Sequence, residues 1–170
     1  MHKVFISHYH ADHSAVNNFI EKFGKGSDKV FIPKIVGDDY DTSINSDNSE
    51  YIMRVIREDY LADSTVTIVL IGDETYKRKY VDWEVAATLR NDFKNKRSGL
   101  IGIRLPGQTE SNTVTPYRLQ DNVDSGYAKV YSYTSDASTL ERWIDEAWER
   151  KEYESNKVDN TRPLFKYNRS

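Results

Sequence analysis

Four residues near the start of the chain have types and a spacing that could bind metal ions. His8, His10, Asp12 and His13 form the pattern H-x-H-x-D-H within "FISHYHADHS", residues 5–14. Imidazole nitrogens and carboxylate oxygens are common ligands of catalytic zinc, and bound zinc activates water for hydrolysis. The pattern is therefore compatible with a metal-dependent hydrolase.

The rest of the sequence argues against a pair of zinc ions. Each ion takes about four ligands, yet all four histidines lie within the first 13 residues and cysteine is absent. In the metallo-β-lactamase superfamily, where this spacing is best known, the motif follows several strands, whereas here it follows the first apolar run. We therefore expect no metal site and a structural role for His10 and His13. A metal-dependent hydrolase, or one metal bound by the loop histidines, is kept as a remote alternative.

A second group with chemical potential is the pair Tyr80 and Glu84. The two residues are four positions apart, so on a helix their side chains are neighbours on one face. A carboxylate stabilises positive charge that develops on a sugar ring, and an aromatic ring packs against an apolar face of the same ligand. The pair therefore predicts chemistry at a cationic sugar centre.

The elements that position these residues alternate between strands and helices. Apolar runs predict strands at residues 3–7, 29–33, 64–72, 99–105 and 128–133. Between them, apolar residues repeat with helical spacing, and nine are expected in the core: Val16, Phe19, Ile20, Phe23, Val81, Val85, Leu89, Leu140 and Ile144. Phe93 continues the stripe of the third helix. The alternation predicts an α/β fold, a flavodoxin-like three-layer sandwich with a five-stranded parallel sheet in the order 2-1-3-4-5.

That strand order determines where a ligand would bind. The chain leaves strands 1 and 3 in opposite directions, which opens a crevice at their carboxyl ends. Six residues of these two segments are expected to meet there: Ser7, His8, Tyr9, Gly72, Tyr80 and Glu84. Residues 36–49 are rich in Gly, Asp, Asn and Ser, and we expect a long loop of the kind that often covers a site.

Composition limits the classes of protein that remain. The 170 residues fit one domain, which we place at residues 1–150, followed by a polar C-terminal tail or strap at 151–170. A net charge of −3 without long blocks of one sign does not favour binding to nucleic acid or anionic membranes. The longest apolar run, residues 66–71, is too short to cross a bilayer, no signal peptide is evident, and the absence of cysteine fits a reducing compartment. We expect a cytoplasmic protein.

Other crevice chemistries lack their motifs. A response-regulator receiver needs an acidic pair after the first strand, where this chain has Ser7, His8, Tyr9 and His10. The phosphate cradle of a flavodoxin is absent, as are G-x-G-x-x-G and G-x-x-x-x-G-K-[ST]. We therefore expect no bound nucleotide cofactor.

Two blocks of sequence resemble the TIR domain family, and in particular the bacterial TIR-like proteins that include the TIR subunit of Thoeris anti-phage systems. In "KVFISHYHAD", residues 3–12, a Phe-Ile-Ser run precedes an aromatic residue and an Asp. In "LADSTVTIVLIGDETYKRKYVDWEV", residues 61–85, a Ser precedes the central strand and an aromatic residue stands four positions before a Glu. The resemblance covers residues 2 to about 105.

The resemblance implies an enzyme that cleaves NAD at the bond between nicotinamide and ribose. It assigns the catalytic role to Glu84 and places Ser7, His8 and Tyr9 in the substrate pocket, with NAD as substrate rather than cofactor. Tyr80 stands where the family more often has Trp. Residues 36–48 correspond to a loop that covers the pocket or joins neighbouring domains.

The resemblance also implies products and partners. The products would be ADP-ribose or a cyclic or conjugated ADP-ribose signal, which a downstream effector reads during anti-phage defence. The implied partners are NAD, this effector, and further copies of the chain joined through TIR–TIR contacts. A non-catalytic interaction module is the alternative. Trp83 lies roughly opposite the apolar stripe of its helix, where it is either exposed or partly buried against a neighbouring loop, and the loop at 36–48 is acidic.

Overall fold

Five parallel strands form the centre of the molecule. The computed structural model describes residues 1–27, 29–35, 49–91 and 96–170. The strands are β1 (Lys3–Ser7), β2 (Ile32–Ile35), β3 (Val66–Ile71), β4 (Gly99–Arg104) and β5 (Lys129–Tyr131). They pair in the order β2-β1-β3-β4-β5, and all four pairs are parallel. The predicted flavodoxin-like α/β fold and its strand order are confirmed.

The second strand differs from its prediction. We expected it at residues 29–33, ended by Pro33, but the strand includes Pro33 and runs to Ile35. Proline has no N–H group to donate to a neighbouring strand, so it is disfavoured in a central strand. β2 tolerates Pro33 because β2 lies at the edge of the sheet and pairs only with β1.

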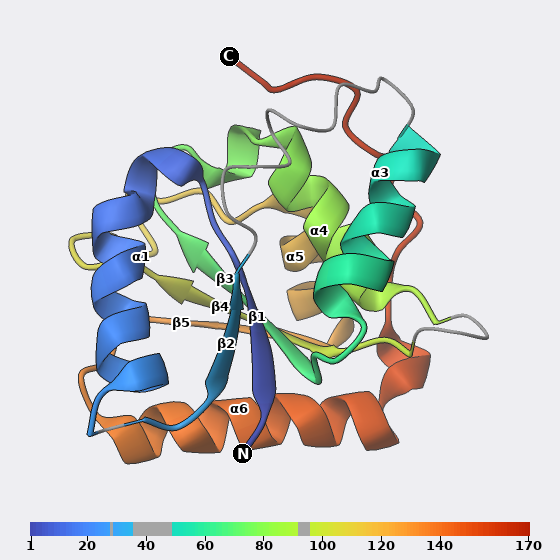
Figure 1. Ribbon diagram of the computed structural model, residues 1–170. Coiled ribbons are helices and arrows are strands. Elements are labelled where there is room, and N and C mark those ends of the chain that lie inside the picture. Colours follow the sequence, from blue (N-terminus) through green and yellow to red (C-terminus); the bar gives the residue numbers. More distant parts are fainter. Residues whose placement is uncertain (28, 36–48, 92–95) are drawn as a thin grey trace.

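The helices form one layer on each face of the sheet (Figure 1). The principal helices are α1 (His13–Ile20), α3 (Ser49–Val55), α4 (Lys79–Leu89), α5 (Tyr117–Ser125) and α6 (Ala137–Tyr153). Short helical turns are η1 (His10–Asp12), η2 (Glu21–Lys25), η3 (Ile56–Leu61), η4 (Thr75–Lys77) and η5 (Ser155–Lys157). Within the described ranges no helix is long and apolar enough to cross a membrane.

Alternate residues of β1 enter different cores. Val4 and Ile6 pack with α1 and α6 on one face, whereas Phe5 packs with α3 and α4 on the other. All nine residues predicted for the core are buried. Because side chains alternate along a strand, Ser7 shares the face of Phe5 and points toward α4.

One helix was not predicted, and two predictions lie outside the described residues. No core residues were predicted between the strands at 99–105 and 128–133, where the structure has α5. Its buried face includes Arg118 and Asn122 beside Leu119, so an apolar stripe is missing from its sequence. The predicted loop at residues 36–48 and the predicted core position Phe93 lie outside the described residues.

Helix α4 is buried on all sides over residues 81–89. The sheet lies beneath it, and residues 154–170, which we call the C-terminal strap, lie along its outer face (Figure 1). The strap covers Trp83, whose Nε1–H group donates to the carbonyl of Phe165 at 2.8 Å. Trp83 is only 4% exposed, so of the two placements that the sequence left open the structure shows the buried one.

Candidate functional site

The predicted crevice contains a buried hydrogen bond between its two segments. The Ser7 hydroxyl donates to Oε1 of Glu84 at 2.8 Å. Ser7 is 0% exposed and Glu84 is 4% exposed. One residue ends β1 and the other lies in the middle of α4, 77 positions later. The structure therefore brings together the carboxylate and the first-loop serine that the sequence indicated.

Glu84 belongs to a polar seam between two apolar clusters. The Thr88 hydroxyl, one turn further along α4, donates to the Glu84 carbonyl at 2.8 Å. Thr88 Oγ1 also lies 2.9 Å from Thr67 Oγ1 on β3. Since a hydroxyl has only one proton, Thr67 is the donor in the second bond. On either side of the seam, α4 packs apolar residues against the sheet.

A buried arginine near Glu84 is already occupied by another carboxylate. Nε of Arg118 lies 3.0 Å from Oδ1 of Asp82, and Nη2 lies 3.3 Å from Oδ2. The Phe165 amide donates to the same Oδ2 at 2.9 Å. Asp82 thus takes the guanidinium of Arg118 on the side of α4 that faces α5 and the strap. Glu84, two residues later, faces β1 instead.

The first loop touches the same segment a second time, through Tyr9. The guanidinium of Arg78 lies over the Tyr9 ring, 4.4 Å from its centroid, and the ring of His10 meets Tyr9 edge-on at 4.7 Å. Arg78 directly precedes α4. His8 lies between Ser7 and Tyr9 in sequence and is partly buried. Nothing in the spacing of Arg78 predicted this contact.

Gly72 leaves room for the Asp12 carboxylate where β3 ends. A β-carbon at position 72 would overlap the Asp12 carboxylate. The Gly72 amide donates to the Thr75 hydroxyl at 2.8 Å, which begins the turn toward α4. Asp12 stands at the N-cap position of α1 but forms no capping hydrogen bond through its side chain. The sequence placed it in the histidine-rich pattern, and its contact with Gly72 was not predicted.

The environment of Asp12 favours its neutral form. Burial raises the pKa of this carboxyl above its ordinary value, and the charges of Asp73 and Glu74 raise it further, while His10 opposes them. Within the described part of the chain, Oδ2 of Asp12 is buried without a hydrogen-bond partner. Three acidic groups therefore meet beside the end of β3.

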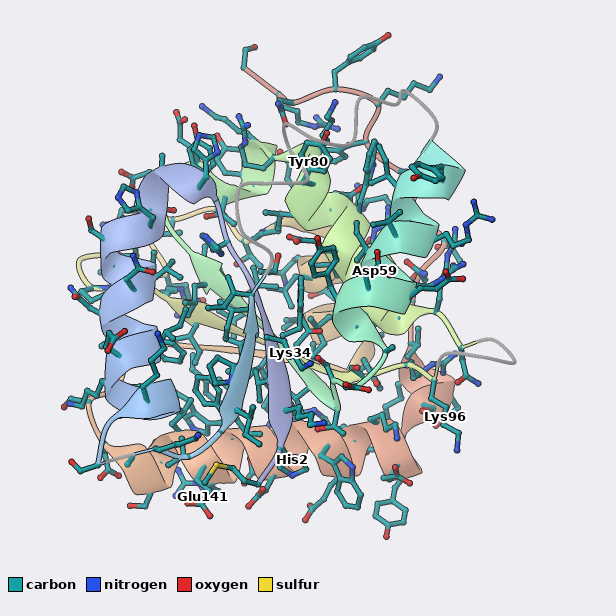
Figure 2. All side chains as sticks on the ribbon, viewed as in Figure 1. His2, Lys34, Asp59, Tyr80, Lys96 and Glu141 are labelled. Carbon is teal, nitrogen blue, oxygen red and sulfur yellow. The ribbon has the colours of Figure 1, made fainter. Side chains whose placement is uncertain are left out.

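Tyr80 lies at the start of α4, one turn before Glu84 (Figure 2). It is partly buried, and its ring meets Trp83 edge-on at 5.4 Å. The Lys79 ammonium lies over both rings, at 5.2 Å and 5.6 Å from their centroids. The ring of Tyr80 thus packs with Trp83 and Lys79 in the first turns of α4.

The histidine-rich loop gathers no metal ligands among the residues that are described. No group of three or more His, Cys, Asp or Glu side chains is arranged to hold an ion there. His10 and His13 are exposed, and His13 Nδ1 lies 3.3 Å from the carbonyl of His10.

Fold and site together define a flavodoxin-like α/β protein with a buried carboxylate at the strand-order switch point. Over residues 5–110 the chain matches the profile of a family described as Thoeris protein ThsB, TIR-like domain. The match covers more than half of the 170 residues and includes both Ser7 and Glu84. The chain belongs to this family of TIR-like domains, as the resemblance of its two sequence blocks indicated. No curated protein matches the chain.

Proposed function

We propose that this TIR-like domain cleaves NAD at the bond between nicotinamide and ribose, with Glu84 as the catalytic residue. The observation that carries the proposal is the hydrogen bond between Ser7 and Glu84, at the edge of the sheet where ligands of this fold class bind. Membership of the TIR-like family supports the same reaction.

The proposed chemistry needs one well-placed negative charge. The bond between C1′ of the ribose and the nicotinamide nitrogen breaks, and its electron pair neutralises the positively charged ring. Nicotinamide leaves as a neutral molecule, so no general acid is needed. Positive charge builds up on C1′ and the ring oxygen, and the Glu84 carboxylate stabilises it. The Ser7 hydroxyl donates a hydrogen bond to one oxygen of that carboxylate, which fixes the orientation of the Glu84 side chain.

The second half of the reaction determines the product. If water adds to C1′ and loses a proton, the product is ADP-ribose. If a nucleophilic atom of the ADP-ribosyl group itself adds to C1′, the product is cyclic, and if an atom of another acceptor adds, the product is a conjugate. In an anti-phage system such a product acts as a signal for a downstream effector. We include this role, and assembly of several copies through TIR–TIR contacts, in the proposal.

The test measures the release of nicotinamide from NAD over time by chromatography. We expect Glu84→Gln to reduce the rate by about 10²-fold or more, because the charge that stabilises the transition state is lost. Glu141→Gln is the matched control, since Glu141 is exposed on α6 at the other end of the molecule from Tyr80 (Figure 2). The assay is run with and without lysate of phage-infected cells, with lysate alone subtracted. Equal nicotinamide release by wild type and Glu84→Gln would remove the assignment.

The alternative functions have less support. The interaction module was inferred from a possible exposure of Trp83 and from the acidic loop at 36–48. The Trp83 side chain is buried beneath the strap, and the loop lies outside the described residues. The metal-dependent hydrolase was inferred from the histidine loop, and His10 and His13 point to solvent. We therefore propose neither.

A further inference from the structure

Three cationic residues belong to the segment that begins α4 or are attached to it by backbone hydrogen bonds, and we call Arg78, Lys79 and Arg169 the cationic rim. Each lies over aromatic rings instead of pairing with a carboxylate. The ring-centroid distances are 4.4 Å for Arg78 over Tyr9, 5.2 Å for Lys79 over Tyr80, and 4.7 Å for Arg169 over Phe165. Among the described residues none of the three forms an ion pair.

The C-terminal strap brings Arg169 to this position. The Arg169 amide donates to the carbonyl of Lys77 at 2.8 Å, and the Lys79 amide donates to Oδ1 of Asn168 at 2.9 Å. These bonds attach the last residues of the chain to the segment that begins α4. The rim is therefore built from two parts of the sequence that are far apart.

The lack of acidic partners is notable in a chain with 27 acidic and 24 basic residues. Nearby cations are paired: Lys77 lies 3.3 Å from Glu74, and Arg162 lies 2.7 Å from Asp121. These pairs neutralise the neighbourhood and leave the positive charge of the rim uncompensated. A cluster of uncompensated charges attracts an ion of opposite sign.

Among the described residues, the acidic groups at the end of β3 form no ion pair with the rim. Glu74 pairs with Lys77 at 3.3 Å, and Asp73 accepts a hydrogen bond from Nε2 of Gln108 at 2.9 Å. The Asp12 carboxylate lies against Gly72.

Arg78 connects the rim to the candidate active site. The contact between Arg78 and Tyr9, and the hydrogen bond between Ser7 and Glu84, join the same two segments of the chain. A guanidinium whose contact is with an aromatic ring still has N–H groups that can bind two oxygens of one phosphate. Lysine offers no such paired edge.

We propose that the cationic rim binds the diphosphate of a dinucleotide while its cleavable ribose lies at Glu84, and that Arg78 provides the main contact. The inference rests on the proposed NAD cleavage for the identity of the ligand. It adds a specific recognition site for the diphosphate, built from Arg78 on Tyr9 and completed by the C-terminal strap.

The first test measures binding without any reaction. Isothermal titration calorimetry compares the binding of ADP with that of adenosine, the uncharged probe, to the full chain. We expect ADP to bind far more tightly than adenosine. Arg78→Gln should weaken ADP binding about tenfold or more, and Arg78→Lys should restore only part of it. Arg142→Gln, an exposed arginine on α6, is the matched control and should bind like wild type. Equal ADP affinities of wild type and Arg78→Gln, or equal affinities for ADP and adenosine, would overturn the inference.

The second test separates this inference from the proposed reaction. With NAD as substrate, Arg78→Gln should raise KM about tenfold with little change in kcat. With nicotinamide riboside, which has no phosphate, the same variant should behave like wild type. An unchanged KM for NAD would overturn the diphosphate site and leave Glu84 untouched. ADP binding that depends on Arg78, in a protein that releases no nicotinamide, would support the site and count against the reaction.

Discussion

At the scale of single residues, Glu84 occupies a position that stability alone does not explain. Burying a carboxylate costs free energy unless hydrogen bonds or charges compensate for it. Val81 and Val85, the adjacent inward positions of α4, are apolar and fully packed. An apolar residue at position 84 would fill the same space without that cost. A carboxylate held by the Ser7 hydroxyl at this place is consistent with the catalytic role that we propose for Glu84.

Asp12 offers a test of the electrostatics at the same edge of the sheet. Its pKa is raised above the ordinary value of 3.8 by burial and by Asp73 and Glu74, so the folded protein binds this proton more tightly than the unfolded chain does. The free energy of unfolding therefore falls as pH rises from 3.8 through the raised pKa, and the loss persists at neutral pH. Asp12→Asn removes the charge while keeping the shape. We expect this variant to be more stable than wild type at neutral pH and equally stable well below pH 3.8.

Urea unfolding at the two pH values measures this difference, and Asp136→Asn provides a control of opposite sign. Hydrogen bonds from Thr139 lower the pKa of Asp136, so its charged form stabilises the folded protein. Replacing Asp136 should therefore cost stability at neutral pH. A neutral-pH loss of stability in Asp12→Asn would show that the Asp12 charge is favourable where it lies.

At the scale of elements, α4 is fixed to its neighbours by a buried ion pair. Arg118 on α5 is 1% exposed and Asp82 is 5% exposed, and the guanidinium also donates to Asn160 and Pro163 of the strap. Removing one member of such a pair leaves a buried charge without compensation. The geometry of α4, and with it the position of Glu84, depends on this pair.

Asp82→Ala should lower the free energy of unfolding by about 3–5 kcal/mol, the usual cost of breaking a buried pair. Asp121→Ala is the matched control, because its pair with Arg162 at 2.7 Å is partly open to solvent. We expect a clearly smaller loss for the control in denaturant unfolding. Equal losses in the two variants would mean that burial adds nothing to the Asp82 pair.

The elements differ in how well the sequence predicted them. Strands β1, β3 and β4 are continuous apolar runs buried on both faces, so their composition indicates them directly. Helix α5 was missed because its buried face carries a charged residue and an amide, whose partners include Asp82 of α4 and Asp159 of the strap. The burial of Trp83 was left open for a related reason, since helical spacing does not show which segment covers the outer face.

The candidate site shows the same limit. The sequence predicted that Ser7, Gly72, Tyr80 and Glu84 lie at one crevice, because each belongs to a segment whose place relative to the sheet was predictable, and the structure joins Ser7 to Glu84. The contact of Asp12 with Gly72 and that of Arg78 with Tyr9 depend on how two loops meet, and no periodicity encodes that meeting.

At the scale of the whole molecule, the C-terminal strap connects the last residues of the chain to the helix that carries Glu84. Its contacts with α4 and the segment before it run from Ala86, which accepts from Asn160 at 3.2 Å, to Lys77, which accepts from Arg169 at 2.8 Å. Residues 111–170 lie outside the family match, yet part of them covers this helix. We infer that the strap and the TIR-like region act as one structural unit.

Phe165→Ala tests this unity in the full chain. The Phe165 side chain is buried between the strap and α5, with the Tyr117 ring at 6.2 Å, while its backbone bonds to both Asp82 and Trp83. Truncating a buried phenylalanine costs about 3–5 kcal/mol, so the strap should detach in part of the population. Amide hydrogen exchange should then become faster over residues 77–86, and nicotinamide release should fall. Tyr167→Ala, at a strap position that is 79% exposed, should leave both unchanged. Equal rates of amide hydrogen exchange over α4 in Phe165→Ala and Tyr167→Ala would mean that the strap does not hold this helix. The position of Glu84 would then be determined by the sheet and α5 alone.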